Sequence, residues 1–218
     1  MIIAKFVAVV ILGYLLGSIP FGVLVGRRQA RVDIRQHGSR KTGATNVLRT
    51  AGSKAAALVV GLDLLKGALA VVFAGLIIGK SYLVVNNFAL GMVVAQVAAA
   101  LAAMAGHNYS VFLKFRGGRG VATFFGGLIA LCPVAGVFGT EVFIIGAGLT
   151  GFASLGSIAG AVGTYIVLVP LTIVHGFPIE YLIYALVGVV IVFVMHRDNI
   201  IRLMSGKERR LGDKIGGG

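Results

Sequence analysis

The segment KFRGGRG, Lys114–Gly120, separates two apolar stretches and reveals how the whole chain is organised. Residues 83–105 before it and the run that begins at Val121 are apolar, whereas the segment itself carries fixed positive charge. The same alternation of apolar runs and basic breaks continues along the 218 residues. We therefore expect a chain that crosses a membrane repeatedly and turns in basic, glycine-rich loops.

The composition excludes an ordinary soluble domain. The chain is 58% hydrophobic, with a mean hydropathy of +0.98, whereas soluble domains are about 45–50% apolar. The net charge of +13 lies in loops between apolar runs, so anionic lipid or phosphate ligands are the expected partners, and nucleic acid is not. The single cysteine, Cys132, excludes an intrachain disulfide and a cysteine metal cluster. We expect no cofactor and no metal.

Seven apolar stretches are candidate spans, because a helix needs about 20 apolar residues to cross roughly 30 Å of hydrocarbon. We interpret 121–150 as two helices that turn tightly at Cys132–Pro133, although one proline-kinked helix is the alternative. The first stretch resembles a signal peptide, but its apolar run exceeds the usual core of about 7–15 residues, so we expect a span. The seven candidates are residues 3–25, 55–78, 83–105, 121–132, 134–150, 156–174 and 179–195.

Basic residues gather on one face of this seven-span arrangement. The loop 26–54 holds eight lysines and arginines, the loop 106–120 holds three, and the tail 196–218 holds six, so 17 of 20 share a face. The positive-inside rule makes that face cytoplasmic. Six spans would place the tail on the opposite face from the other basic loops.

The predicted fold class is therefore an all-α integral membrane protein with seven transmembrane helices, its N-terminus outside and its C-terminus cytoplasmic. We expect one polytopic domain, residues 1–218. Its cytoplasmic parts are the loops 26–54, 106–120 and 150–156 and the tail 196–218.

Three polar stretches fall on the cytoplasmic face: Asp33–Gly52, Gly106–Thr123 and His196–Glu208. Glycines let backbone N–H groups converge on an anion, and arginine presents a planar fork that matches phosphate oxygens. RGGRGVAT also leads directly into a span, and helix N-termini attract anions. We predict that Arg116, Gly117, Gly118, Arg119 and Gly120 hold a phosphate at the membrane surface. The alternative is a basic anchor for lipid headgroups.

The usual catalytic signatures are missing from the sequence. It contains no Gly-x-Ser-x-Gly elbow, no P-loop and no His-x-x-x-x-Asp pattern on the cytoplasmic face. Catalysis would therefore rely on positioning and electrostatics, or on a substrate that is already activated. A transporter of a small organic phosphate and a lipid-surface scaffold are the competing functions. Asp63 and Lys66, three residues apart in one span, predict a buried pair that braces the active face, with Lys66 contacting substrate as the alternative.

Taken together, GSIPFG, DIRQHGS, GATNVLR, YSVFLKFRGGRGVAT and HRDNIIRLMSGKE resemble the acyl-phosphate-dependent glycerol-3-phosphate acyltransferase family of bacteria. The resemblance covers nearly the whole chain. It implies a seven-span enzyme of the bacterial inner membrane, surrounded by lipid. It also implies transfer of an acyl group from acyl phosphate to the 1-hydroxyl of sn-glycerol 3-phosphate, which gives lysophosphatidate and phosphate without a covalent acyl-enzyme.

The resemblance also implies roles for individual residues. The catalytic pair would be His196 and Asn199, with either His196 or a substrate phosphate accepting the proton. The expected contacts to phosphate and glycerol come from Ser39, Thr45, Asn46, Arg49, Gly117, Gly118, Arg119, Gly120 and Ser154. The sequence departs from the family pattern in two places. Arg40 and Lys41 replace a glycine and an asparagine, and Arg116 and Arg119 replace two lysines.

Overall fold

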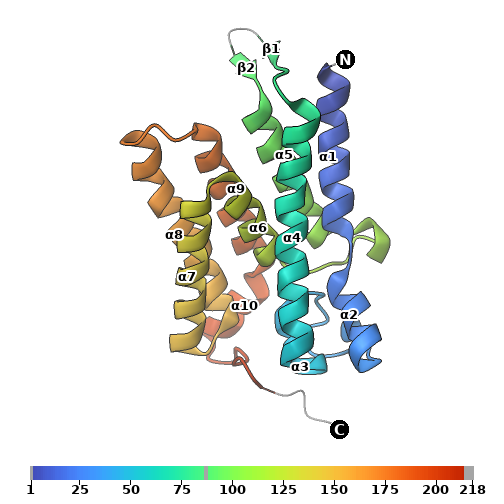
Figure 1. Cartoon of the computed structure of the whole chain (residues 1–218). Helices are drawn as coiled ribbons and strands as arrows, with labels where there is room; N and C mark the ends of the chain where they lie inside the picture. Colours follow the sequence, from blue (N-terminus) through green and yellow to red (C-terminus); the bar gives the residue numbers. More distant parts are fainter. Residues whose placement is uncertain (1, 86–87, 214–218) are drawn as a thin grey trace.

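The computed structural model describes residues 2–85 and 88–213, and most of them are helical (Figure 1). Two short 3₁₀ turns, Ile34–Gln36 and Val111–Leu113, lie in the loops. The strands are β1 (Leu83–Val85) and β2 (Phe88–Leu90). The α-helices are α1 (Ile2–Ser18), α2 (Phe21–Ala30), α3 (Ala44–Ala51), α4 (Ser53–Ile78), α5 (Met92–Asn108), α6 (Val121–Leu131), α7 (Pro133–Thr150), α8 (Ala153–Ile173), α9 (Ile179–Met195) and α10 (Arg197–Met204).

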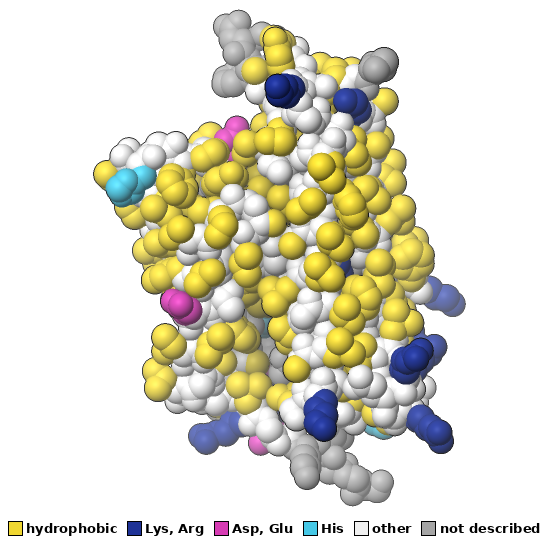
Figure 2. All heavy atoms as spheres, in the orientation of Figure 1, with side chains coloured by type: hydrophobic (Ala, Val, Ile, Leu, Met, Phe, Trp, Pro, Cys, Tyr) yellow, Lys and Arg dark blue, Asp and Glu magenta, His cyan; other side chains and the backbone are white. Residues whose placement is uncertain are grey.

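Length and composition identify a helical membrane protein. Within the described residues, four helical stretches are long and apolar enough to cross a membrane: Ile2–Ala30, α4, α7 and α8. A fifth is added if α9 and α10, which are bent by 61° relative to each other, count as one span. Apolar side chains cover the middle of the molecule, and basic side chains gather toward the end where α2, α3 and α10 lie (Figure 2). Seven crossings and their orientation stay a prediction.

Two of the expected spans have different bounds in the structure. The stretch 3–25 is interrupted after Ser18, because Pro20 supplies no N–H for a continuous helix, and α2 begins at Phe21. The stretch 83–105 begins with an antiparallel hairpin that pairs Leu83 with Leu90, and α5 starts only at Met92. The β-branched Val84 and Val85 favour a strand. This hairpin is the exception to the predicted all-α class.

The predicted break in 121–150 is confirmed. Helix α6 ends at Leu131 and α7 begins at Pro133, where the missing N–H of proline costs no helical hydrogen bond. Cys132 lies buried at the junction. The two helices run in opposite directions, so the start of α6 and the end of α7 lie toward the same end of the molecule (Figure 1).

Small residues hold the helices together at short distance, as expected for helix packing in lipid. A Cβ at Gly17 in α1 would collide with the backbone of Ala103 in α5, and one at Gly126 in α6 would collide with the carbonyl of Leu64 in α4. Helices α7 and α8 also meet closely, since a Cβ at Gly156 would lie 2.6 Å from the Phe143 carbonyl oxygen. These contacts fix the ends of α4, α6 and α8 around one polar region.

Candidate active site

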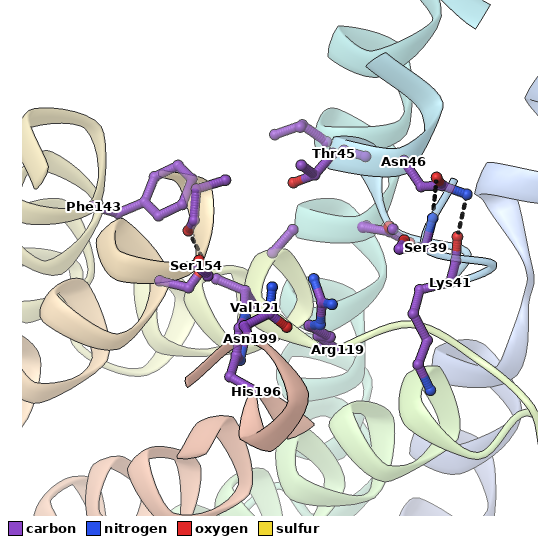
Figure 3. Close-up of a pocket in the computed structure, with 18 of the residues that line it drawn as sticks. Ser39, Lys41, Thr45, Asn46, Arg119, Val121, Phe143, Ser154, His196 and Asn199 are labelled. Carbon is purple, nitrogen blue, oxygen red and sulfur yellow. Dashed lines mark hydrogen bonds between the residues drawn. The ribbon is translucent and has the colours of Figure 1, made fainter. Parts of the chain in front are cut away.

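A pocket of about 170 Å³ lies where the polar loops meet the ends of α4, α6, α7 and α8 (Figure 3). One water needs only roughly 10–15 Å³ of such space, so the pocket admits a polar molecule of several heavy atoms. Charged residues line one part of it, namely Lys41, Asp63, Arg49, Arg119, Glu208 and Arg209. Apolar residues from three helices line another part, namely Val60, Leu64, Val121, Phe125 and Phe143. Figure 2 shows a hollow on the surface between α7 and α4.

The structure brings most of the sequence-predicted residues together in this pocket. Arg119, His196 and Asn199 lie in its centre, Thr45 and Ser39 lie on the α3 side, and Ser154 lies on the α8 side (Figure 3). The lining residues among those predicted are Ser39, Thr45, Asn46, Arg49, Arg119, Gly120, Ser154, His196 and Asn199. Gly117 and Gly118 do not line the pocket, and Arg116 is exposed outside it.

Close packing explains the two glycines that lie behind the pocket. A Cβ at Gly117 would collide with the carbonyl oxygen of His107, and a Cβ at Gly118 would collide with the imidazole of His107. The Gly118 N–H also donates to the His107 carbonyl at 3.0 Å. Gly120 begins α6 with a φ of 76°, a left-handed conformation that favours glycine. The glycine-rich segment is thus shaped to carry Arg119 past His107 into the pocket.

Asn46 organises the loop in front of α3. Its Nδ2 donates to the carbonyl oxygens of Ile34 at 2.8 Å, Lys41 at 3.0 Å and His37 at 3.2 Å. Its Oδ1 accepts from the Ser39 N–H at 3.1 Å. The side chain is 1% exposed and its amide is occupied by its own chain. Asn46 therefore shapes the wall that presents Ser39, and contacts to a ligand are not needed to explain it.

Arg49 attaches the C-terminal segment to α3. Its Nη2 donates to the carbonyl oxygens of Arg210 at 3.0 Å and Arg209 at 3.2 Å. The Leu211 N–H donates to the Gly151 carbonyl at 2.7 Å, so the same segment also contacts the α7–α8 turn. Burial lowers the pKa of Arg49 from its ordinary value, and the nearby charge of Arg209 lowers it further. These contacts close one side of the pocket.

Glu208 belongs to the third polar stretch, but its contacts could not be predicted from that motif. Its Oε1 accepts from Asn199 Nδ2 at 2.6 Å and from Ser154 Oγ at 3.1 Å. Its Oε2 accepts from Arg202 Nε at 2.8 Å, and its side chain is 6% exposed. One carboxylate therefore orients two of the predicted site residues.

Arg119 is a cation that contacts no acidic side chain within residues 2–85 and 88–213. It is mostly buried, and its Nε has no hydrogen-bond partner in the described part of the chain. Burial lowers the pKa of Arg119 to about 10, so the guanidinium stays protonated at neutral pH. An unpartnered guanidinium that faces a pocket is suited to bind an anion such as phosphate.

His196 has a defined tautomer. Its Nδ1 lies 2.8 Å from the Val192 carbonyl oxygen. A carbonyl only accepts, so Nδ1 carries the hydrogen and Nε2 of the neutral ring carries a lone pair. Burial, assisted by the charge of Arg119, lowers the pKa of His196 to about 4. The imidazole is therefore neutral at physiological pH and can accept a hydrogen bond at Nε2.

The predicted pair of Asp63 and Lys66 is confirmed, with Nζ 2.9 Å from Oδ1 and both side chains 3% exposed. Lys66 also donates to the Ile19 carbonyl at 3.1 Å and does not line the main pocket. His107 from α5 is a third member that the sequence did not reveal, with Nδ1 3.5 Å from Asp63 Oδ1. Across residues 2–85 and 88–213, no three His, Cys, Asp or Glu side chains are placed to share a metal ion.

The fold and the pocket define a class: a helical membrane protein whose buried cationic site adjoins an apolar wall. The family model described as glycerol-3-phosphate acyltransferase matches residues 7–206. Glycerol-3-phosphate acyltransferase 3 of Dehalococcoides mccartyi strain CBDB1 is 64% identical over 214 residues, which cover 98% of this chain and 99% of that protein. The chain therefore belongs to the glycerol-3-phosphate acyltransferase family, membrane enzymes of phospholipid biosynthesis.

Two solved structures share the fold. Both are of PlsY (YgiH), an integral membrane glycerol 3-phosphate acyltransferase. Its glycerol 3-phosphate form superposes with a TM-score of 0.80 at 35% identity and covers 95% of this chain and 96% of that chain. Its lysophosphatidic acid form gives 0.78 at 34% identity and covers 95% of each. These findings confirm the family resemblance and favour an enzyme over a transporter or a scaffold.

Proposed function

We propose that the protein transfers an acyl group from an acyl phosphate to the 1-hydroxyl of sn-glycerol 3-phosphate, giving lysophosphatidate and inorganic phosphate. The observation that carries this proposal is the pocket itself. Arg119 presents an unpartnered guanidinium beside His196 and Asn199, and apolar side chains of α4, α6 and α7 line the same cavity. A phosphate and an acyl chain can therefore bind next to each other. The glycerol 3-phosphate form of a family member supports the acceptor.

The arrangement of hydroxyls favours an activated donor. Ser154 donates to Glu208 and Ser157 donates to the Ala153 carbonyl. Among the residues that the structure describes, no serine hydroxyl shares a hydrogen bond with a histidine, as the nucleophile of a covalent mechanism would require. An acyl phosphate is a mixed anhydride that needs no enzyme nucleophile. We therefore propose direct transfer without an acyl-enzyme.

In the proposed step, the 1-hydroxyl oxygen attacks the acyl carbonyl carbon, and the bond from that carbon to the phosphate oxygen breaks. Phosphate leaves with the electron pair. A pKa of about 4 makes His196 a weak base, whereas a phosphate group has its second pKa at about 6. We propose that His196 Nε2 accepts a hydrogen bond from the 1-hydroxyl before the attack, and that the proton passes to a substrate phosphate as the new C–O bond forms. Arg119 would stabilise the phosphate charges.

We propose distinct roles for the other predicted residues. Arg119 and Asn199 at the centre of the pocket, and Ser154 on its α8 side, contact the ligand, since all three residues line the cavity. Asn46 and Arg49 hold the walls: Asn46 bonds to its own loop, and Arg49 Nη2 donates to two carbonyls of the C-terminal segment, while Arg49 Nε has no partner among the described residues. Ser39, Thr45 and Gly120 complete the surface around the phosphate.

We also propose that the chain forms one domain with seven spans in the bacterial inner membrane, with the N-terminus outside and the C-terminus cytoplasmic. The clustering of the polar loops at one end supports this arrangement. A cysteine introduced at Lys80 should react with an impermeant thiol reagent from the periplasmic side. A cysteine introduced at Lys207 should not react, and the reverse pattern would refute the orientation.

Phosphate release from acyl phosphate tests the reaction directly. Purified protein should release phosphate only when both acyl phosphate and glycerol 3-phosphate are present, with lysophosphatidate formed in equal amount. Acyl-coenzyme A in place of the acyl phosphate should give no product. An acyl adduct on the intact protein, or transfer from acyl-coenzyme A at an equal rate, would contradict the proposal.

A further inference from the structure

Asp63 and His107 lie between the main pocket and a second, smaller void that has no room for a water molecule. Both residues line the main pocket, and both line the space beneath the α1–α2 break. Asp63 comes from α4 and His107 from the last turn of α5, and both are almost completely buried. Neither residue has been given a role in the reaction derived above. Burial of two ionisable side chains between helices is costly, and such residues commonly have a function.

The contacts of His107 point to the glycine-rich segment. The ring atoms Nε2, Cδ2 and Cε1 are the three nearest neighbours of a Cβ built at Gly118, and the nearest of them is Nε2. The backbone of the same residue accepts the Gly118 N–H at 3.0 Å. His107 therefore contacts the loop through both its ring and its carbonyl group. Gly118 immediately precedes Arg119, so any shift of Gly118 moves the guanidinium.

Asp63 lies against the opposite side of the His107 ring, in close contact but without a hydrogen bond in the described structure. Asp63 Oδ1 lies 3.5 Å from His107 Nδ1 and 2.9 Å from Lys66 Nζ. Lys66 in turn donates to the Ile19 carbonyl at 3.1 Å, which ties the carboxylate to the α1–α2 break. The imidazole is thus placed between a carboxylate that is fixed by α4 and a backbone that carries Arg119.

We propose that His107, held by Asp63, is a positioning residue that sets where Arg119 lies in the pocket. Neither side chain needs to touch the reacting atoms. The inference rests on the proposed function in one respect, because Arg119 is taken to bind the phosphate of glycerol 3-phosphate. Loss of His107 should therefore have its main effect on the binding of glycerol 3-phosphate and a smaller effect on the melting temperature.

A double-mutant cycle can test this contact, because the two glycines differ in what opposes them. The Cβ of an alanine at position 118 would collide with the His107 ring, so His107→Ala should remove the obstacle. The φ of Gly118 lies outside the left-handed region, so the backbone itself permits alanine there. Alanine at Gly117 meets the backbone carbonyl of residue 107, which remains in every variant. Gly117→Ala is therefore the matched control for Gly118→Ala.

We expect His107→Ala and Gly118→Ala each to raise the KM for glycerol 3-phosphate about tenfold, because small misplacements of a positioning group are costly. The double variant His107→Ala/Gly118→Ala should be no worse than His107→Ala alone, whereas Gly117→Ala should add its full effect to His107→Ala. Asp63→Asn should raise the same KM and add little to His107→Ala. The inference would be overturned if the KM increase in the double variant equalled the product of the increases in His107→Ala and Gly118→Ala. A normal KM in His107→Ala would also overturn it.

Hydrogen–deuterium exchange gives a readout that does not need turnover. In detergent-solubilised His107→Ala, the peptide that covers residues 114–122 should exchange faster than in the wild type, with peptides of α7 and α8 unchanged. Gly148→Ala, at a helical position with open space around it, should leave both exchange and KM unchanged. If exchange in residues 114–122 of His107→Ala were unchanged, the positioning role would be refuted even if the KM rose. An inactive wild type would refute the proposed reaction and leave the exchange result interpretable.

Discussion

Asn46 and Asn199 are both buried asparagines of the pocket, 1% and 3% exposed, yet their amides are used in opposite ways. Asn46 donates to three backbone carbonyls and accepts one N–H, so its hydrogen bonds stay within one loop. Asn199 donates to Glu208, and its Oδ1 has no partner among the described residues. The wall that contains Asn46 is closed, because its hydrogen bonds are made within the loop. The wall that contains Asn199 is open, because it presents a polar atom that a ligand can bind.

Two asparagines from similar polar motifs therefore have different roles: Asn46 stabilises its loop, and Asn199 presents a polar atom to the pocket. Buried polar atoms without partners are costly, so they persist where a ligand supplies the missing bond. Five residues that line the pocket have such an atom in the described structure, namely Arg49, Asp63, His107, Arg119 and Asn199. Arg119 and Asn199 are the two that lie at the centre of the pocket. The comparison predicts that changes to the closed wall alter stability, whereas changes to the open wall alter catalysis.

The largest expected effect is the loss of stability in Asn46→Ala. The substitution leaves three carbonyls and the Ser39 N–H without their partner, at about 1–3 kcal/mol for each buried group that stays unpaired. We expect the free energy of unfolding to fall by about 3–5 kcal/mol. Thermal unfolding in detergent measures this. Asn199→Ala is the comparison variant: it removes a single hydrogen bond, to Glu208, so its melting temperature should fall less than that of Asn46→Ala while activity is lost. The reverse pattern would break the comparison.

Arg119→Ala should cause the next largest change, in catalysis. Removal of one charge-assisted contact of about 1.5–3 kcal/mol lowers kcat/KM roughly 10- to 150-fold. Both a higher KM for glycerol 3-phosphate and a lower kcat should contribute. Arg116→Ala is the matched control, because Arg116 is exposed in the same segment and lies outside the pocket. Normal kinetics in Arg119→Ala would mean that the phosphate binds elsewhere.

His196 should make stability depend on pH. Burial lowers the pKa of His196 to about 4 from an ordinary value of 6.5. Between these values the unfolded chain binds a proton that the folded chain does not, so stability falls as the pH is lowered. The loss between about pH 7 and pH 5 should be about 2 kcal/mol. His196→Asn should lose less over the same interval, and parallel melting curves for the two proteins would contradict the buried neutral imidazole.

The catalytic role of His196 is tested separately by His196→Ala. If a substrate phosphate accepts the proton, the acid limb of the kcat profile should be retained in the variant, at a lower rate. Disappearance of that limb would instead make His196 the general base.

Arg40→Gly should produce the smallest effect. Arg40 has a φ of 57°, in the left-handed region that favours glycine. A left-handed conformation costs a side chain about 1–2 kcal/mol, and the greater freedom of unfolded glycine offsets about 0.5–1 kcal/mol of this. The free energy of unfolding should therefore rise by at most about 1.5 kcal/mol. Arg40→Ala removes the charge but keeps Cβ, so an equal gain there would assign the effect to charge.

Local sequence patterns predicted the features that depend on spacing along one helix. The helix break at Cys132–Pro133 and the pair of Asp63 and Lys66 are of this kind. The interruption of the first stretch was visible as Pro20, and two asparagines at 86–87 interrupt the third apolar run, but composition alone assigned both stretches to uninterrupted spans.

The contacts within the pocket could not be predicted in the same way. Glu208 and Ser154 are 54 residues apart, and His107 meets Asp63 across two helices. Their pairing depends on how α4, α5 and the C-terminal segment pack. The motif around Asn46 indicated a polar site, but only the structure distinguishes an amide bonded to its own loop from one facing a ligand.

A structure of the protein with glycerol 3-phosphate tests the central claim most directly, namely that the separate polar segments form one phosphate site beside an acyl-binding wall. The account predicts the phosphate within hydrogen-bonding distance of Arg119 and the 1-hydroxyl next to His196 Nε2, with Asn46 still bonded to its loop. A phosphate bound outside this pocket, or one that replaces the loop contacts of Asn46 and leaves Arg119 without a partner, would contradict it.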